Sequence, residues 1–248
     1  MTRPRFEICV EGVDGAVAAE AGGGDRVELC ASLAEGGITP SLGTVRAALA
    51  AVTIPIYVMV RPRGGDFLYS EREFASMLDD VAAIRDAGAA GVVFGCLTAD
   101  GAIDEDRTAA LVAAARPLGV TVHRAFDMTA DAEAALEALI RCGVDRVLTS
   151  GHAPTVLDGL GELAHLGRLA GGRIIVMGCG GLRPENAAQV VHDTGLAEFH
   201  FSAPMHMSSG MRFRNAGMFM GSAPPEREFT LELTDPALVR ATIAAATS

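Results

Sequence analysis

Eight short apolar runs recur along this chain, and each is followed by a segment long enough to form a helix. The runs occupy residues 6–9, 26–30, 54–60, 91–96, 119–122, 146–150, 173–177 and 198–202. From the fourth run onward they begin about 27 residues apart, at Gly91, Gly119, Arg146 and Arg173. This is the length of a strand, a helix and two connections. Such alternation predicts a parallel sheet, either closed into a barrel or open and doubly wound.

Residues with useful chemistry follow almost every run, and this favours the closed barrel. In a (β/α)8 barrel the loops that leave the C-terminal ends of the strands meet at one mouth. The length of 248 residues also fits one such barrel, which typically has about 250 residues. We therefore predict an α/β fold, a (β/α)8 TIM-like barrel that forms a single domain over residues 1–248.

Helix signals fill the segments between the runs. Ser70 and Glu73 predict a capping box before a helix over 74–87. The other expected helices are one capped by Asp104 that ends near Arg116, one over 131–142, one with Pro184 in its first turn, and one over 235–246.

A long segment without this pattern follows the eighth run. Residues 203–225 are rich in Met, Ser, Gly and Arg, and we predict a long loop over 203–234 before the last helix. Loops of this length are uncommon unless they are functional or disordered. The loop is expected to be a flap over the mouth or an oligomer contact, with disorder as the alternative.

Composition excludes several classes of function. The formal net charge is −11, which argues against nucleic acid as a partner because that binding depends on basic patches. All 20 basic residues are arginine, so enzymes that need a lysine amine, such as Schiff-base aldolases, are excluded. No apolar run approaches the roughly 20 residues that span a bilayer. Without a visible signal peptide, a cytoplasmic protein with five reduced cysteines is expected.

Several strings, taken in order, resemble the CutC copper-homeostasis family. They are Glu28-Leu-Cys30, Glu35-Gly-Gly-Ile-Thr-Pro-Ser41, Arg61-Pro-Arg-Gly-Gly-Asp-Phe67, His123-Arg-Ala-Phe-Asp127 and Leu148-Thr-Ser-Gly151. The resemblance runs from about Phe6 to Ala203 and resumes at residues 211–215. It implies a TIM-like barrel, a cytoplasmic and commonly homo-oligomeric protein, and a link to copper. It implies no agreed reaction, so whether the chain is an enzyme stays open.

Cu(I) binding at the barrel mouth is the first functional hypothesis. The pattern Glu-x-Cys occurs at the ends of the first two runs, as Glu7-x-Cys9 and Glu28-x-Cys30. Side chains alternate along a strand, so both thiols face the interior if both glutamates do. Soft sulfur ligands select Cu(I), and the resemblance implies that Cys9 and Cys30 are its ligands. Further soft donors lie in the long loop, at Met205, Met207, Met211, Met218 and Met220.

An isomerase or lyase acting on a small phosphate- or carboxylate-bearing metabolite is the alternative. Glu28 or Glu7 would be the general base and His123 the general acid, with Asp127 orienting the imidazole. The expected anion-binding residues are Arg61, Arg63, Arg124, Ser150, Gly151, Gly180, Gly181 and Ser202, because guanidinium groups and glycine-rich loops at a barrel mouth bind anions. Such cations would repel Cu⁺.

Simpler explanations stay open for the same residues. Arg61 with Glu28, or Arg124 with Asp127, can form a structural ion pair, and His123 can be a core histidine. Glu28, His123 and Asp127 are also the residue types that hold a hard divalent metal, although no metal-ligand spacing supports that site. A barrel that serves only as an oligomeric scaffold is the third possibility, and His200 is the better candidate for a second functional histidine.

Overall fold

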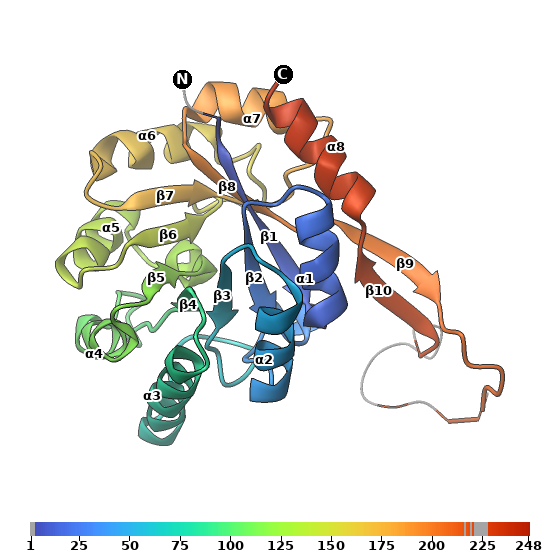
Figure 1. Ribbon diagram of the computed structural model, residues 1–248. Coiled ribbons are helices and arrows are strands. Elements are labelled where there is room, and N and C mark those ends of the chain that lie inside the picture. Colours follow the sequence, from blue (N-terminus) through green and yellow to red (C-terminus); the bar gives the residue numbers. More distant parts are fainter. Residues whose placement is uncertain (1–2, 216, 219, 221–227) are drawn as a thin grey trace.

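Eight parallel strands close into a barrel in the computed structural model, which describes residues 3–215, 217–218, 220 and 228–248 (Figure 1). The order is β1 to β8 around the barrel, and β1 pairs with both β2 and β8. The strands are β1 (Arg5–Glu11), β2 (Arg26–Cys30), β3 (Ile56–Met59), β4 (Gly91–Phe94), β5 (Gly119–Val122), β6 (Arg146–Thr149), β7 (Ile175–Gly178) and β8 (Glu198–Phe201). The predicted TIM-like barrel is confirmed, and the open doubly wound sheet is not formed.

One helix follows each barrel strand. The helices are α1 (Gly12–Ala21), α2 (Leu42–Ala51), α3 (Glu71–Asp86), α4 (Glu105–Ala115), α5 (Ala132–Arg141), α6 (Leu160–Ala170), α7 (Ala187–Thr194) and α8 (Pro236–Ala246). Two short 3-10 turns, η1 (Leu33–Glu35) and η2 (Arg124–Met128), lie after β2 and β5. No helix in the described part of the chain has the length and apolar character needed to cross a membrane.

The predicted helix caps are formed, with shifts at two helix starts. Ser70 and Glu73 form the capping box of α3, which begins at Glu71, three residues before the predicted start. Asp104 and Asp131 accept backbone N–H groups at the starts of α4 and α5. Pro184 does not lie in the first turn of α7. The side chain of Asn186 accepts the N–H of Arg183 and closes a separate turn there, so the helix begins only at Ala187.

Charged side chains occupy much of the barrel interior. In the register of β1 and β2, Glu7 lies opposite Arg26 and Cys9 lies opposite Glu28. The guanidinium groups of Arg26 and Arg146 lie 4.9 Å and 5.5 Å from the centre of the Tyr57 ring. These side chains form a polar layer beneath the mouth, so the floor of any site there is charged.

The predicted loop over 203–234 is in part a two-stranded antiparallel sheet. β9 (Pro204–Ser208) pairs with β10 (Thr230–Thr234), and Met207 lies opposite Leu231. Figure 1 shows this hairpin extending outward from the barrel beside α1 and α8. The alternation of apolar and polar residues in Met-His-Met and Leu-Glu-Leu is a strand pattern that the loop prediction missed. Residues 216, 219 and 221–227 of the predicted loop lie outside the described part.

Candidate functional site

A cavity of about 760 Å³ opens at the C-terminal ends of the strands. It contains seven of the residues singled out from the sequence in its wall: Cys9, Glu28, Arg61, His123, Arg124, Asp127 and His200. Apolar side chains, including Met59, Phe67, Leu68, Leu97 and Leu148, make up much of the rest. The common mouth expected from the topology is therefore present. Predicted site residues that do not line it are Glu7, Cys30, Arg63, Ser150, Gly151, Gly180, Gly181 and Ser202.

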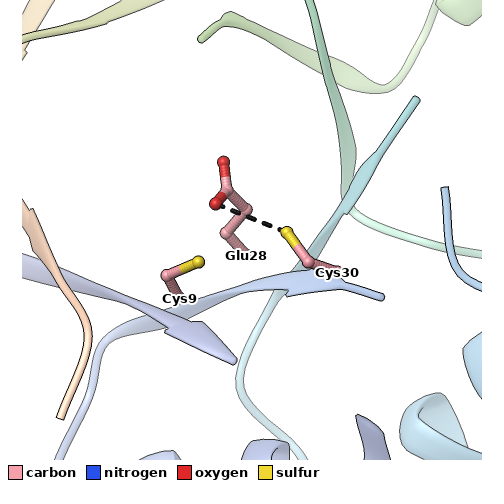
Figure 2. A group of neighbouring side chains, drawn as sticks. All are labelled: Cys9, Glu28 and Cys30. Atoms are coloured by element: carbon pink, nitrogen blue, oxygen red, sulfur yellow. Dashed lines mark hydrogen bonds between the residues drawn. The ribbon is translucent and has the colours of Figure 1, made fainter. Parts of the chain in front are cut away.

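Two thiols and one carboxylate meet at the ends of β1 and β2 (Figure 2). The sulfur atoms of Cys9 and Cys30 and a carboxylate oxygen of Glu28 all lie within 4.8 Å of one another. The Cys30 thiol donates to Oε2 of Glu28 at 3.6 Å. Cys30 is buried and Cys9 is partly exposed, so Cys9 forms the face of this cluster toward the cavity.

Both thiols are held in the protonated form. The neighbouring Cys30 thiol and burial raise the pKa of Cys9 well above its usual value. The interaction with Cys9 lowers the pKa of Cys30, but burial and the negative charge of Glu28 outweigh it and raise that pKa to about 11. A metal that binds here must therefore displace two protons.

His200 connects the thiol cluster to the charged interior. Its Nδ1 lies 2.8 Å from Oε1 of Glu7, and its Nε2 lies 3.8 Å from Oε2 of Glu28. Burial lowers the pKa of His200, but the charges of Glu28 and Glu7 and the neighbouring Cys9 outweigh it and raise the pKa well above the usual value. At neutral pH His200 is thus a cation held between two glutamates.

Three interior residues that the sequence hypotheses left out complete this network. Arg26 binds Glu7 and also donates to Oε2 of Glu198 at 2.9 Å, and Arg146 donates to the same oxygen at 2.6 Å. The signal was present, because Arg26 has the same strand parity as Glu28 and Glu198 the same parity as His200. Charged residues inside an apolar run point to a polar barrel interior.

Arg61 does not pair with Glu28. Its guanidinium donates to three backbone carbonyls, those of Glu35 at 2.6 Å, Gly37 at 3.0 Å and Gly65 at 2.8 Å. It thereby fixes the loops that follow β2 and β3. Arg63, predicted to bind anions, does not line the cavity and instead pairs with Glu73 at 2.6 Å and with Asp66, at the cavity wall, at 3.0 Å.

Asp127 organises a loop and does not orient His123. Its carboxylate accepts the backbone N–H groups of Ser150 and His152 and the hydroxyl group of Thr149. It also pairs with Nε of Arg124 at 2.8 Å, so the structural ion pair weighed for these two residues is formed. The predicted Asp127–His123 contact is replaced by these bonds, and Glu28, His123 and Asp127 do not gather into a metal-ligand group.

The predicted anion-binding loops are occupied by internal contacts. The hydroxyl of Ser150 donates to the carbonyl of Ala153 at 2.6 Å and accepts from Arg124 at 2.7 Å. The carbonyl of Gly180 accepts from the N–H of Val156, and a Cβ at Gly180 would lie 3.0 Å from Cβ of Ser150. These residues pack the loops after β6 and β7 against each other.

Ser202 and Gly181 also lie away from the main cavity. Ser202 lines a smaller cavity of about 280 Å³, between Cys9 and the base of the β9–β10 hairpin. The carbonyl of Gly181 accepts from the side chain of Asn186 at 2.9 Å. Ser202 and Gly181 are therefore not part of the wall that contains Arg61 and His123.

His123 lies in the cavity wall as an uncharged imidazole. Its Nδ1 accepts the N–H of Ala125 at 3.2 Å, which assigns the hydrogen to Nε2. Burial and the charge of Arg61 lower its pKa to about 3. A neutral imidazole donates a hydrogen bond but does not supply the proton of a general acid at neutral pH. With its hydrogen on Nε2, His123 has the form of a neutral hydrogen-bond donor.

The fold and the cavity together define a (β/α)8 barrel protein with a cavity at the C-terminal mouth and a pair of thiols beside it. Residues 5–205 match the family described as the CutC family. The chain belongs to the CutC family, and the resemblance seen in the sequence strings is confirmed.

Relatives of known sequence span nearly the whole chain. A protein named family protein CutC from Mesorhizobium japonicum is 64% identical over 243 residues, which cover 98% of this chain and 94% of the relative. The human copper homeostasis protein cutC homolog is 48% identical over 235 residues, covering 95% of this chain and 86% of the human protein.

Solved structures agree with the fold. A crystal structure of a CutC from Streptococcus agalactiae superposes with a TM-score of 0.75 at 30% identity, covering 79% of this chain and 97% of that chain. A phosphoribosylanthranilate isomerase from Thermotoga maritima superposes with a TM-score of 0.57 at 15% identity, covering 98% of each chain. The second likeness shows the barrel fold alone.

Proposed function

We propose that this protein binds Cu(I) through Cys9 and Cys30 and serves in copper homeostasis. The observation that carries the proposal is the convergence of two sulfur atoms and a Glu28 oxygen within 4.8 Å of one another at the mouth of the barrel. Thiolates are soft ligands and select Cu(I) over harder cations. The names of the human and mouse relatives point in the same direction.

The charges around the thiol pair favour a cation more than the sequence suggested. Arg61 is bonded to backbone carbonyls and Arg124 to Asp127, so neither arginine pairs with the thiol cluster. Glu28 lies directly against Cys30. Loss of both thiol protons adds two negative charges beside Glu28, and Cu⁺ offsets one of them. His200 lies on the other side of Glu28, between this residue and Glu7. The expected repulsion of Cu⁺ is therefore reduced for Arg124, whose charge is paired with that of Asp127.

Anaerobic titration with Cu(I) in the presence of a competing chelator tests the proposal. The parent protein is expected to bind one Cu(I), with an affinity that increases with pH because two protons are released. Cys9→Ser and Cys30→Ser are expected to lose the site. Cys142→Ser is the matched control. Cys142 is partly exposed at the end of α5, does not line the cavity, and donates its thiol hydrogen to the carbonyl of Glu105 in α4. Equal binding by all four proteins contradicts the proposal.

The proposal includes a cytoplasmic location and a homo-oligomer. All five cysteines are free thiols, the form that a reducing compartment maintains. One face of the β9–β10 hairpin presents Met205, Met207 and Leu231 with exposed fractions of 38%, 46% and 44%. An exposed apolar face of this kind is the contact surface that we assign to a second copy of the chain.

A further inference from the structure

Phe67 lies against two nitrogen-bearing groups in the wall of the mouth cavity. Its ring centre is 4.9 Å from that of His123 and 5.1 Å from Cζ of Arg61. All three residues line the cavity, and none belongs to the thiol cluster. His123 and Arg61 are also close enough for the charge of Arg61 to lower the pKa of His123.

Each of the two polar residues carries a buried nitrogen without a hydrogen-bond partner. Among the described residues, Nε2 of His123 and Nε of Arg61 have no hydrogen-bond partner. The hydroxyl of Tyr69, which interacts with Arg61, and Oε1 of Glu28 in the same cavity are unpaired too. His123 is only 5% exposed and Arg61 only 6%. Because Nδ1 of His123 accepts from Ala125, its Nε2 carries the hydrogen. Buried donors are nearly always satisfied in folded proteins, so two unmet donors in one wall indicate an absent partner.

The positive charge of Arg61 lacks a carboxylate partner from the protein. The three acceptors of its other N–H groups are backbone carbonyls. The neighbouring cations are paired, Arg124 with Asp127 and Arg63 with Glu73. A buried cation without a counter-ion is unfavourable. An anion that binds next to Arg61 supplies this counter-ion, so its binding free energy becomes more favourable.

We propose that the mouth cavity binds a small organic carboxylate whose oxygens accept hydrogen bonds from Nε2 of His123 and Nε of Arg61. Two donors suit the two oxygens of a carboxylate. The apolar wall formed by Leu68, Leu97 and Leu148 accommodates a short carbon skeleton. Both nitrogens are covered, so the partly exposed Phe67 ring moves aside when the ligand enters. This site is independent of Cu(I) binding by Cys9 and Cys30.

A phosphate group fits this site less well. Ser150, Gly151, Gly180 and Gly181 do not line this cavity. The glycine-rich loops after β6 and β7 therefore do not add N–H groups to its wall, whereas phosphate sites present several N–H groups to one anion. The apolar lining also favours a ligand with carbon–hydrogen surface over a free inorganic ion.

Titration of the whole protein with pyruvate, followed by the imidazole ¹⁵N resonances, tests the proposal. The Nε2 resonance of His123 is expected to shift in a saturable manner with pyruvate and to stay in place with pyruvamide, its uncharged amide. His123→Asn keeps an oxygen that accepts from Ala125 and removes the Nε2 donor. This variant is expected to bind pyruvate at least roughly tenfold more weakly, as for loss of one bond to a charged group.

The copper variants separate this proposal from the preceding one. Cys9→Ser with Cys30→Ser is expected to lose Cu(I) and to bind pyruvate with the parent affinity. His123→Asn is expected to keep its Cu(I) stoichiometry, which also shows that it is folded. An unshifted His123 resonance at every pyruvate concentration overturns the carboxylate site, and so does parent-like pyruvate affinity in a folded His123→Asn protein.

Discussion

His200 and Glu7 form an ion pair inside the barrel, with Nδ1 of the imidazole 2.8 Å from Oε1 of the carboxylate. Burial raises the pKa of Glu7, but the charges of Arg26 and His200 outweigh it and lower that pKa to about 2. Both members of the pair are therefore charged at neutral pH. The Glu7 side chain has no exposed surface, so this charge depends entirely on its protein partners.

Glu7→Gln is expected to lower the free energy of unfolding by about 3–5 kcal/mol, because it leaves buried cations without their counter-ion. Urea denaturation at neutral pH measures this change. The chain offers a matched control in Glu133, whose Oε1 also lies 2.8 Å from a histidine nitrogen, that of His165, but on the exposed surface. Glu133→Gln is expected to change stability by no more than about 1 kcal/mol. Similar losses in the two variants contradict a structural role for the buried network.

The sequence predicted the barrel and the mouth because both follow from periodicity. Apolar runs set the strands, and parallel strands bring their C-terminal ends together, so Glu28, Arg61 and His123 were placed in one wall without knowledge of any contact. The partners of those side chains were not predictable in this way. Arg61 bonds to carbonyls of loops that precede and follow it, and loop geometry is not encoded in strand spacing.

A second limit concerns the loops after β6 and β7. Glycine and serine there have the composition of a phosphate-binding loop, yet Ser150 and Gly180 pack against each other. The composition of a loop does not show which of its N–H groups are already paired. Asp127 likewise had the right spacing to His123, but the N–H groups of residues 150 and 152 compete for its carboxylate.

His123 is expected to give the protein a dependence of stability on pH. Its pKa is lowered from 6.5 to about 3. Below about pH 6.5 His123 is therefore protonated in the unfolded chain and stays unprotonated in the folded chain. Stability from this residue is thus intact above about pH 6.5 and falls as the pH drops toward about 3, by up to about 1.4 kcal/mol per pH unit. Urea denaturation between about pH 5 and about pH 7.5 measures the slope.

His123→Asn is expected to remove that part of the slope, because the replacement does not titrate. His192→Asn serves as the control, since the His192 side chain is 88% exposed on α7. If the free energies of unfolding of the parent and of His123→Asn fall in parallel as the pH falls, His123 does not cause the pH dependence.

Tyr57 makes two glycines necessary inside the barrel. A Cβ at Gly91 would lie 2.3 Å from Cε1 of Tyr57, and one at Gly119 would lie 2.1 Å from its Oη. Gly91→Ala and Gly119→Ala are each expected to lower the free energy of unfolding by about 1–3 kcal/mol through overpacking. Thermal and urea denaturation measure this loss.

The hydroxyl of Tyr57 is the atom nearest to Gly119, which supplies a test within the same site. Tyr57→Phe removes that atom. The double variant Gly119→Ala with Tyr57→Phe is therefore expected to recover part of the lost free energy of unfolding, whereas Gly91→Ala with Tyr57→Phe is not.

Gly161→Ala in α6 is the control, because a Cβ there has no neighbour within 4 Å. It is expected to be neutral or to stabilise by up to about 1 kcal/mol. Equal recovery of both glycine variants rules out the hydroxyl contact as the cause.

Met207 and Leu231 are paired across the β9–β10 hairpin and share its exposed apolar face. If this face joins two copies of the chain, Met207→Glu with Leu231→Glu places charges in the contact and is expected to dissociate the oligomer. Light scattering after size exclusion measures the mass. The two substitutions do not change the barrel core. Any decrease in the melting temperature of the separated subunits is therefore expected to come from the lost association alone. Leu157→Glu changes a leucine that is 41% exposed elsewhere on the surface and is expected to leave the mass of the parent unchanged. If the variant with Met207→Glu and Leu231→Glu also keeps the mass of the parent, the subunits contact each other through another surface.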